Sequence, residues 1–254
     1  MSQISTVDAS GSLATLPATS KDYLPSVNIH QDLLVPRYLE QTYWWAYLHP
    51  VGVRFFERQW IVNTILWGNF SRLRDAALDE LGESISGRTL QVACVYGDFT
   101  PMVGARLGSD AHLDVVDVAP VQLENLTRKI GSPDNIRLHH MDSTNLQFQE
   151  GSFDNVVVFF LLHEQPAGAR ARTIQEALRV VKPGGKVVFV DYHAPWIFNP
   201  FRYAMIPILS LLEPFALDLW KREILDWVPK ALAPSELRKE TYFGGLYQKV
   251  VMIR

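Results

Sequence analysis

The chain has 254 residues, of which 48% are hydrophobic, and its formal net charge at pH 7 is -3. This length and composition suffice for one α/β domain with appendages and a full core. The small negative charge, without a basic cluster, argues against nucleic acid as a partner. The lone cysteine, Cys94, excludes an internal disulfide and a cysteine-rich zinc site, and it suits a reducing cytoplasm.

The N-terminal part of the chain divides into a polar tail and an aromatic region. Residues 1–25 are rich in Ser, Thr and Ala and lack the basic start and apolar core of a secretory signal, so we expect a flexible tail. Residues 26–86 contain the aromatic segment YLEQTYWWAYLHP (38–50) and a helical periodicity over 51–81, which predicts apolar helices. These helices either simply cover a sheet or form a substrate lid, in which aromatic side chains suit a flat lipophilic ring.

The most informative stretch is LQVACVYGDFT, residues 90–100. A buried strand leads into a turn and then into a helix, which is the context of a nucleotide-binding glycine loop. Where such a loop carries an acidic residue and three alternating glycines, this chain has Gln91, Ala93, Val95 and Gly97. The sequence therefore predicts a cofactor-binding loop that has been rebuilt around one remaining glycine.

Strands and helices alternate after this loop. Apolar strands are expected over 113–117, in the region before 141, over 153–162 and over 186–192, and helices over 119–130 and 166–181. We expect Gly184 and Gly185 to turn the chain from helix to strand with positive backbone angles. The alternation predicts an α/β fold, a Rossmann-like doubly wound sheet that is mainly parallel and has helices on both faces.

Two aspartates follow strands of this predicted sheet. Asp117 lies about twenty residues after the loop, where a carboxylate can accept hydrogen bonds from both hydroxyls of a ribose. Alternatively it caps the helix 119–130, because Asp is a favoured residue at that position. Asp142 follows the third strand and is either a ligand-binding side chain or a solvated loop carboxylate.

A second apolar segment follows the last parallel strand. Residues 195–220 read PWIFNPFRYAMIPILSLLEPFALDLW, and Pro207, Glu213 and Pro214 keep every apolar stretch well below the roughly 20 residues that cross a bilayer. We expect the insert 195–235 to lie on a membrane surface or to form the wall of a pocket, with ordinary helix packing as the alternative. The closing segment 241–254 predicts an antiparallel hairpin with Gly244 and Gly245 in its bend.

From about residue 87 to 195 the chain resembles the class I S-adenosylmethionine (SAM) methyltransferases, nearest to the C-methyltransferases of ubiquinone and menaquinone biosynthesis. YGDFT resembles their TGDLT or TGDFT, FDNVVVFFLLH resembles their fourth strand, and LRVVKPGGKVVFVDYHAP resembles their RVLKPGG turn and fifth strand. The resemblance implies a SAM-binding domain over 87–254, in which Asp142 meets the adenine amino group. The cofactor-binding residues it implies are Gln91, Ala93, Val95, Tyr96, Gly97, Asp98, Asp117, Val118, Asp142, Ser143 and Phe159.

Three further segments, YWWAYLHP, ACVYGDFT and FGGLYQ, resemble the bacterial rhodoquinone biosynthesis proteins of the RquA family. That resemblance implies SAM as amino donor, ubiquinone as acceptor, manganese as helper ion, and rhodoquinone as product, in which an amino group replaces a ring methoxy group. The loop suits this chemistry. A neutral amide at Gln91 removes the anion that would keep the methionine amine charged, and Val95 adds bulk where glycine would let the methionine end lie against the backbone.

Amination needs a base and a polarised quinone carbonyl. Tyr96 and Asp98 are candidates for orientation and proton acceptance. His163, Glu164 and His193 follow the fourth and fifth strands, at the edge where open α/β sheets bind ligands. We predict a catalytic role for His163 and list all three as candidate manganese ligands, although a lone histidine is more often structural.

Two other functions stay open from the sequence. One is ordinary methylation of a quinone, and the other is a non-catalytic scaffold that kept the fold. We expect a cytoplasmic protein that associates peripherally with the inner membrane and takes ubiquinone as a lipophilic substrate.

Overall fold

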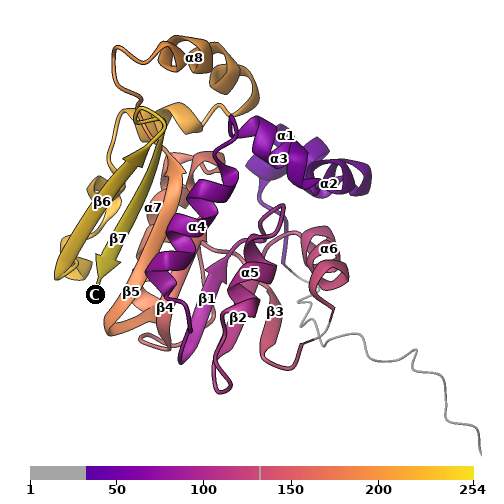
Figure 1. Cartoon of the computed structure of the whole chain (residues 1–254), viewed down its shortest axis with the longest axis vertical. Helices are drawn as coiled ribbons and strands as arrows, with labels where there is room; N and C mark the ends of the chain where they lie inside the picture. The colour runs from indigo at the N-terminus through magenta and orange to yellow at the C-terminus, as the bar shows by residue number, and fades with distance from the viewer. Residues whose placement is uncertain (1–32, 132) are drawn as a thin grey trace, which may run out of the picture.

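The computed structural model describes residues 33–131 and 133–254, so the predicted tail and the first residues of the predicted lid lie outside the described residues. One seven-stranded sheet has the order β3-β2-β1-β4-β5-β7-β6 (Figure 1). The strands are β1 (Arg88–Val92), β2 (His112–Asp117), β3 (Ile136–His140), β4 (Phe153–Phe159), β5 (Val181–Tyr192), β6 (Glu236–Tyr242) and β7 (Tyr247–Ile253). Strands β1 to β5 pair in parallel, and β7 is antiparallel to both β5 and β6. The predicted fold class and the closing hairpin are confirmed.

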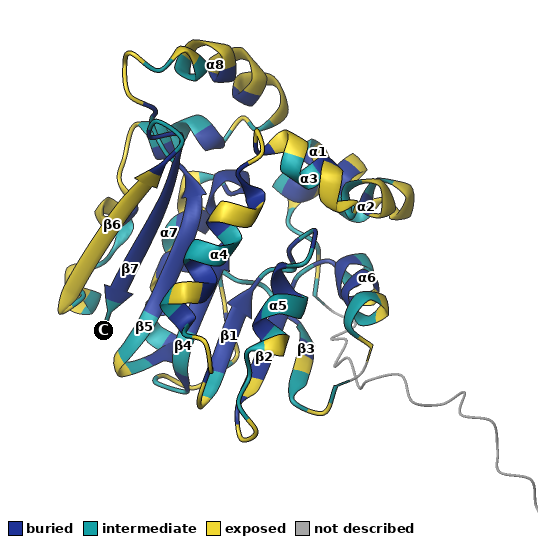
Figure 2. Cartoon of the chain, in the orientation of Figure 1, coloured by how far each residue is buried: buried dark blue, intermediate teal, exposed yellow. Residues whose placement is uncertain are grey.

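Helices pack against both faces of the sheet. They are α4 (Phe70–Leu81), α5 (Phe99–Ala105) and α6 (Pro120–Ile130) on one face and α7 (Ala167–Val180) on the other. Because successive side chains of a strand point to opposite faces, Val157 joins the core beneath α4 to α6 while its neighbours Val156 and Val158 join the core beneath α7. The central strands are therefore buried on both sides (Figure 2).

Strand β4 ends earlier than the apolar run 153–162 predicted. Phe160 adopts a left-handed φ of 53°, and a 3₁₀ turn, η2 (Leu162–Glu164), follows. The cause is a long-range contact: a carboxylate oxygen of Asp191 accepts hydrogen bonds from the backbone N–H groups of Leu162 (2.8 Å) and His163 (3.3 Å). This side chain from β5 bends the chain away from the sheet just where the strand pattern would continue.

The prediction for the two glycines of KPGG is half right. Gly184 has a φ of +77°, whereas Gly185 does not adopt a positive φ, so that prediction is wrong for Gly185. A Cβ atom at Gly185 would lie 2.8 Å from the backbone oxygen of Asp154, and close packing is thus what requires glycine there. The segment lies inside β5, where the register to β4 shifts.

The N-terminal helices lie beyond the carboxyl ends of the parallel strands (Figure 1). They are α1 (Arg37–Thr42), the π-helical turn η1 (Trp44–Leu48), α2 (Pro50–Phe56) and α3 (Gln59–Ile65). The helical periodicity predicted over 51–81 is broken at the extended backbone of Arg58 and at the left-handed pair Trp67 and Gly68. Short helices with turns between them form a cap instead of one long rod.

The insert forms α8 (Pro200–Leu212) and three 3₁₀ turns, η3 (Ala216–Trp220), η4 (Ile224–Trp227) and η5 (Lys230–Leu232). Helix α8 lies at the same end of the sheet as the N-terminal helices (Figure 1). Trp67 connects the two layers, because its indole N–H points to the sulfur of Met205 at 3.2 Å and its ring lies edge-on to Phe201. Within residues 33–131 and 133–254, no helix combines the length and the apolar character needed to span a bilayer.

Candidate functional site

Two adjoining cavities lie at the carboxyl ends of β1, β2 and β4. The larger has a volume of about 550 Å³ and is walled by the N-terminal helices, the loop after β1, the segment after β4, and α8. The smaller, of about 50 Å³, lies between the loop after β1, the ends of β2 and β3, and α1. Tyr47, Cys94, Phe160 and Glu164 line both cavities, so the two share a wall.

The loop after β1 keeps a glycine-like backbone although it lacks the glycines. Ala93 has a left-handed φ of 73°, and Gly97 has a φ of 77°. The fully buried Gln91 side chain donates from Nε2 to the carbonyl of Ala93 and to the Thr100 hydroxyl, both at 2.9 Å. The amide therefore holds the loop from beneath, and Gln91 lines neither cavity.

The smaller cavity brings together most of the predicted adenosine-binding residues. Its lining includes Ala93, Asp117, Val118, Asp142 and Ser143. The sequence missed Tyr38, which also lines it, because nothing local shows that α1 crosses this edge of the sheet.

The helix-capping alternative for Asp117 is wrong, because the N-cap residue of α6 is Ala119 and no side chain caps this helix; ribose binding stays a prediction. One carboxylate oxygen accepts from the N–H of Cys94 and the other from the N–H of Ala119, each at 2.8 Å, just before α6 begins. A carboxylate oxygen has two lone pairs, so each still has capacity for a ribose hydroxyl. Burial raises the pKa of Asp117.

Asp142 and Ser143 are held by short-range and cross-element contacts. A carboxylate oxygen of Asp142 accepts from the N–H of Thr144 at 2.8 Å. The Ser143 hydroxyl lies 3.0 Å from the Thr173 hydroxyl and accepts from Gln165 Nε2 at 3.0 Å. Both side chains are therefore positioned before any ligand arrives.

Tyr96 connects the loop to the N-terminal helices. Its hydroxyl donates to the carbonyl of Ala46 at 2.6 Å and accepts from Gln122 Nε2 at 2.7 Å. Its ring stacks on Tyr47, with centroids 5.7 Å apart. Burial raises the pKa of Tyr96, so this residue lines the larger cavity as a neutral, hydrogen-bonded wall.

Asp98 points elsewhere. Its carboxylate pairs with Arg74 of α4 at 2.6 Å, and it lines neither cavity. The structure thus gives Asp98 a partner in the scaffold and separates it from Val95, Tyr96 and Phe159, the predicted residues that line the larger cavity.

The polar end of the larger cavity is formed by His163 and Glu164 of η2. His163 Nδ1 lies 2.9 Å from a carboxylate oxygen of Asp191, and His163 Nε2 lies 3.8 Å from a carboxylate oxygen of Glu164. Burial alone would lower the pKa of His163, but the Asp191 carboxylate raises it to about 9. Burial raises the pKa of Glu164 to about 8. Asp191 thus favours the charged imidazolium of His163, and burial favours the protonated carboxyl of Glu164.

His193 is not part of this group. Its Nδ1 lies 2.8 Å from the carbonyl of Gly245 and its Nε2 lies 2.9 Å from Lys239 Nζ, and it lines neither cavity. Among residues 33–131 and 133–254, no three His, Cys, Asp or Glu side chains are arranged to hold a metal ion. The three residues named as candidate manganese ligands thus do not fit a common ion, and we assign no step to one.

Sequence reasoning missed Glu213, which lines the larger cavity from the end of α8. The available signal was Glu213 as the one charged residue in the stretch 203–217 of the insert. A charge is costly to bury there, which is a reason to expect a specific role at that position.

Comparison with known proteins places this site in a family context. Residues 89–185 match the family described as "Methyltransferase domain". Demethylmenaquinone methyltransferase of Staphylococcus aureus (strain MRSA252) is 32% identical over 133 residues, which are 52% of this chain and 54% of that protein. The chain thus spans about half the length of the curated relatives it matches.

Two solved structures show the same fold. The N-methyltransferase NodS from Bradyrhizobium japonicum WM9, in complex with S-adenosylhomocysteine, has a TM-score of 0.52 and 17% identity over 72% of this chain and 85% of that one. Phosphoethanolamine N-methyltransferase 2 of Haemonchus contortus has a TM-score of 0.62 and 13% identity over 87% of this chain and 60% of that one. The chain thus shares the fold of these solved methyltransferases, residues 89–185 resemble the methyltransferase domain family, and about half of the chain is similar to demethylmenaquinone methyltransferase.

Proposed function

We propose that this chain is a SAM-dependent transferase whose second substrate is a lipophilic quinone. The observation that carries the proposal is the shared wall between the two cavities: the smaller holds the predicted adenosine-binding aspartates, and the larger is mostly apolar with a polar end. A volume of about 550 Å³ lies within the roughly 300–1,000 Å³ typical of ligand pockets. Similarity to demethylmenaquinone methyltransferase supports a quinone as the ligand.

SAM binding requires the N-terminal helices to move. The smaller cavity, at about 50 Å³, is well below the size of a ligand pocket. Tyr38 and Tyr47, from α1 and η1, line it on the side away from the sheet. Displacement of these two side chains would open room above Asp117 and Asp142, in keeping with a lid role for residues 26–86.

We further propose that the reaction is the amination of ubiquinone to rhodoquinone, as the RquA family resemblance implies. The amine nitrogen of SAM forms a bond to a ring carbon, the bond from that carbon to its methoxy oxygen breaks, and the departing methoxide takes one amine proton and leaves as methanol. Release of rhodoquinone then requires the bond between this nitrogen and the α-carbon of SAM to break, with the electron pair and a proton passing to nitrogen and a proton leaving the adjacent carbon of SAM. Gln91 supports this reaction, because a neutral amide under the loop provides no anion to keep the amine protonated. Val95, on the wall of the larger cavity, fills space that glycine would leave open.

The residues at the polar end have distinct roles in this scheme. His163, held at Nδ1 by Asp191, presents Nε2 to the cavity and donates a hydrogen bond to a quinone oxygen, which makes the ring more electrophilic. Glu164 exchanges a proton near neutral pH, because its pKa is raised to about 8 by burial. Manganese, which the same resemblance implies, does not fit the predicted ligand set, and these steps do not use it.

Quinone methylation is the second candidate, favoured by similarity to demethylmenaquinone methyltransferase. The full chain should be incubated with ubiquinone and SAM labelled either at the α-nitrogen or at the methyl group, with and without added manganese, and the quinone analysed by mass spectrometry. Nitrogen label in the ring supports amination; methyl label in the ring refutes it and supports methylation. No label under any condition supports the scaffold alternative.

Two variants sharpen this assay. Asp117→Ala should abolish labelling, because the ribose loses its acceptor. The triple variant Gln91→Glu, Ala93→Gly, Val95→Gly restores the usual methyltransferase loop and should lose amination. Amination that survives unchanged in the triple variant would contradict the role given to the loop.

We also propose that the chain contacts the cytoplasmic face of the inner membrane around the mouth of the larger cavity. Large apolar side chains are exposed on both layers that border it: Trp60 is 63% exposed on α3, and Trp196 and Phe198, just before α8, are 65% and 90% exposed. Trp67, Ile208 and Leu212 are exposed and also line the cavity, so this surface continues into the pocket. Aromatic rings of this kind favour the headgroup region of a bilayer.

Flotation with vesicles of phosphatidylethanolamine and phosphatidylglycerol tests the contact. The double variant Trp196→Asp, Phe198→Asp should lose vesicle binding. The matched control is Leu237→Asp, which places a charge at an exposed leucine on the outer strand β6. Equal binding by wild type and the double variant would refute the proposed surface.

A further inference from the structure

The polar end of the larger cavity contains a third acidic side chain that the scheme above does not use. Glu213 follows the last residue of α8 and lines the cavity opposite the segment that carries His163 and Glu164. Its Oε2 atom is buried and has no hydrogen-bond partner within the part of the chain that the structure describes. An orphaned buried acceptor or donor costs about 1–3 kcal/mol, so the fold carries a penalty that a bound group could remove.

A second orphaned group lies beside it. The hydroxyl of Tyr43 is also buried and lacks a hydrogen-bond partner among residues 33–131 and 133–254. Burial and the Glu213 carboxylate both raise the pKa of Tyr43. Tyr43 lines neither cavity, so Glu213 is the group of this pair that faces the larger, apolar cavity, which suits a ligand with a polar, hydrogen-bonding head.

Arg170 of α7 connects the segments that carry these acids. It is fully buried and donates from Nε to the carbonyl of Leu162 (2.8 Å) and from Nη2 to the carbonyls of Gln165 (2.8 Å) and Phe215 (2.7 Å). The first two carbonyls flank His163 and Glu164, and the third is two residues beyond Glu213. No carboxylate in the described part of the chain lies within ion-pair distance of this guanidinium, so its hydrogen bonds are to backbone carbonyls alone, and its other contact is the ring of Trp227.

We propose that Glu213 binds a ring oxygen of the quinone head together with His163. Arg170 is the positioning residue, because its hydrogen bonds connect the backbone beside Glu213 to the segment after β4. This inference rests on the proposed function, because it takes the ligand to be a quinone. Burial raises the pKa of Glu213, and a protonated carboxyl donates to the carbonyl oxygen that a quinone presents. The insert therefore contributes a substrate contact in addition to a wall.

The direct test measures the binding of a short-tailed ubiquinone to the full chain through the quenching of tryptophan fluorescence. Glu213→Leu removes the hydrogen bond and should weaken binding by about tenfold. Glu213→Gln retains a donor of the same shape and should bind within a few-fold of wild type. The matched control is Glu223→Gln, which removes a carboxylate from the outer surface of the same insert and should leave affinity unchanged.

The outcomes distinguish a failure of the proposed function from a failure of the Glu213 contact. If the wild-type chain does not bind ubiquinone, the proposed function fails, and this inference fails with it. If wild type binds and Glu213→Leu binds equally well, the inference alone is overturned.

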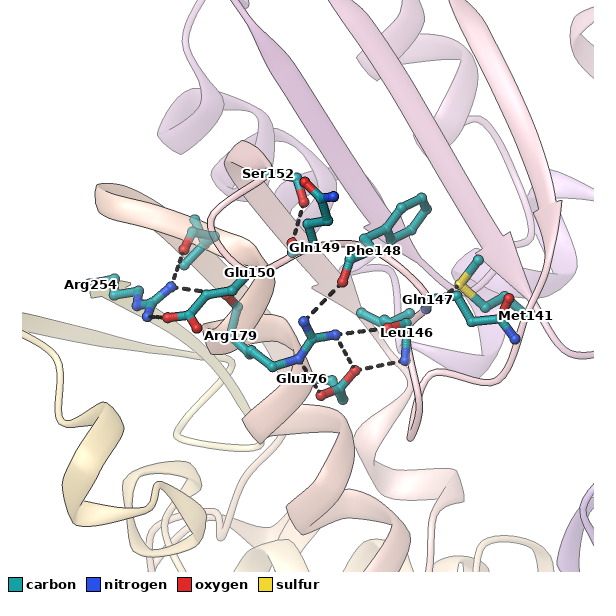
Figure 3. A network of polar contacts seen from close by, with 11 residues as sticks. Met141, Leu146, Gln147, Phe148, Gln149, Glu150, Ser152, Glu176, Arg179 and Arg254 are labelled. Carbon is teal, nitrogen blue, oxygen red and sulfur yellow. Dashed lines mark hydrogen bonds and ion pairs between the residues drawn. The ribbon is translucent and has the colours of Figure 1, made fainter.

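Arg170→Lys tests the positioning role, because one ammonium group does not reproduce three directed hydrogen bonds. The control is Arg179→Lys, on the same helix: Arg179 donates to the carbonyls of Leu146 and Phe148, away from both cavities (Figure 3). Arg170→Lys should weaken quinone binding about as much as Glu213→Leu, and the double variant should be no weaker than either single one, because both remove the same contact. Unchanged affinity in Arg170→Lys, or an equal loss in Arg179→Lys, would overturn the positioning role. If Arg170→Lys does not fold, the Glu213 variants decide the proposal.

Discussion

The left-handed backbone of Ala93 predicts that replacing this residue with glycine stabilises the protein. An L-residue in this region is strained by roughly 1–2 kcal/mol relative to glycine, and Ala93 has a φ of 73° in the loop after β1. Ala93→Gly removes that strain, while the added freedom of the unfolded chain costs about 0.4–1 kcal/mol. We therefore expect Ala93→Gly to stabilise the protein by about 0.5–1 kcal/mol.

The same substitution elsewhere provides the control. Ala171 lies within α7, where a change from alanine to glycine costs about 1 kcal/mol. Two chemically identical changes should thus shift the free energy of unfolding in opposite directions and differ by about 1.5–2 kcal/mol.

Equilibrium urea unfolding measures this difference, and thermal melting provides a second readout at roughly 2–4 °C per kcal/mol for a chain of this size. The reasoning is refuted if Ala93→Gly destabilises the protein as much as Ala171→Gly does. In that case the loop would not hold the left-handed, glycine-like conformation at Ala93.

Three other changes test the remaining contacts of the site. Asp191→Asn removes the carboxylate that raises the pKa of His163 to about 9. A raised folded-state pKa stabilises the protein fully below the ordinary value of 6.5, and this stabilisation is lost as the pH rises through 9. The difference in urea midpoint between wild type and variant should therefore narrow over that pH range, and a constant difference would contradict the assignment. Asp117→Ala should weaken S-adenosylhomocysteine binding about tenfold or more by calorimetry, since the ribose loses its acceptor, and unchanged affinity would remove Asp117 from the site. Glu57, at the end of α2, forms an ion pair with Lys129, in which Nζ and Oε1 are 2.6 Å apart. Glu57→Gln weakens this pair and should speed hydrogen exchange in residues 33–67 without lowering protection in the sheet. Unchanged exchange would show that this ion pair does not hold the lid.

Much of the scaffold could be predicted from local pattern. The apolar runs that become β2, β4 and β5 alternate with amphipathic helices, and this alternation is sufficient for a mainly parallel sheet because parallel neighbours need a helical crossover. The ligand edge follows from the same rule, so Asp117 and Asp142 could be placed together before their surroundings were known. These properties depend on each segment's own period and on the order of segments.

The partners of individual side chains could not be predicted in this way. Asp98 stands in the loop motif, yet Arg74 from α4 takes its carboxylate out of the cavities. His193 follows β5 just as His163 follows β4, but Gly245 and Lys239 of the hairpin hold His193 elsewhere.

The sequence by itself determined the α/β class and the mainly parallel sheet, and it predicted the edge at which a ligand binds, because these follow from periodicity and chain direction. Only the tertiary structure decided that Ala93 is left-handed, that Asp191 raises the pKa of His163, and that Glu213 lines the same cavity. Each of these depends on groups distant in the chain that meet only after folding, and their burial together sets both the backbone strain and the proton affinities of the site.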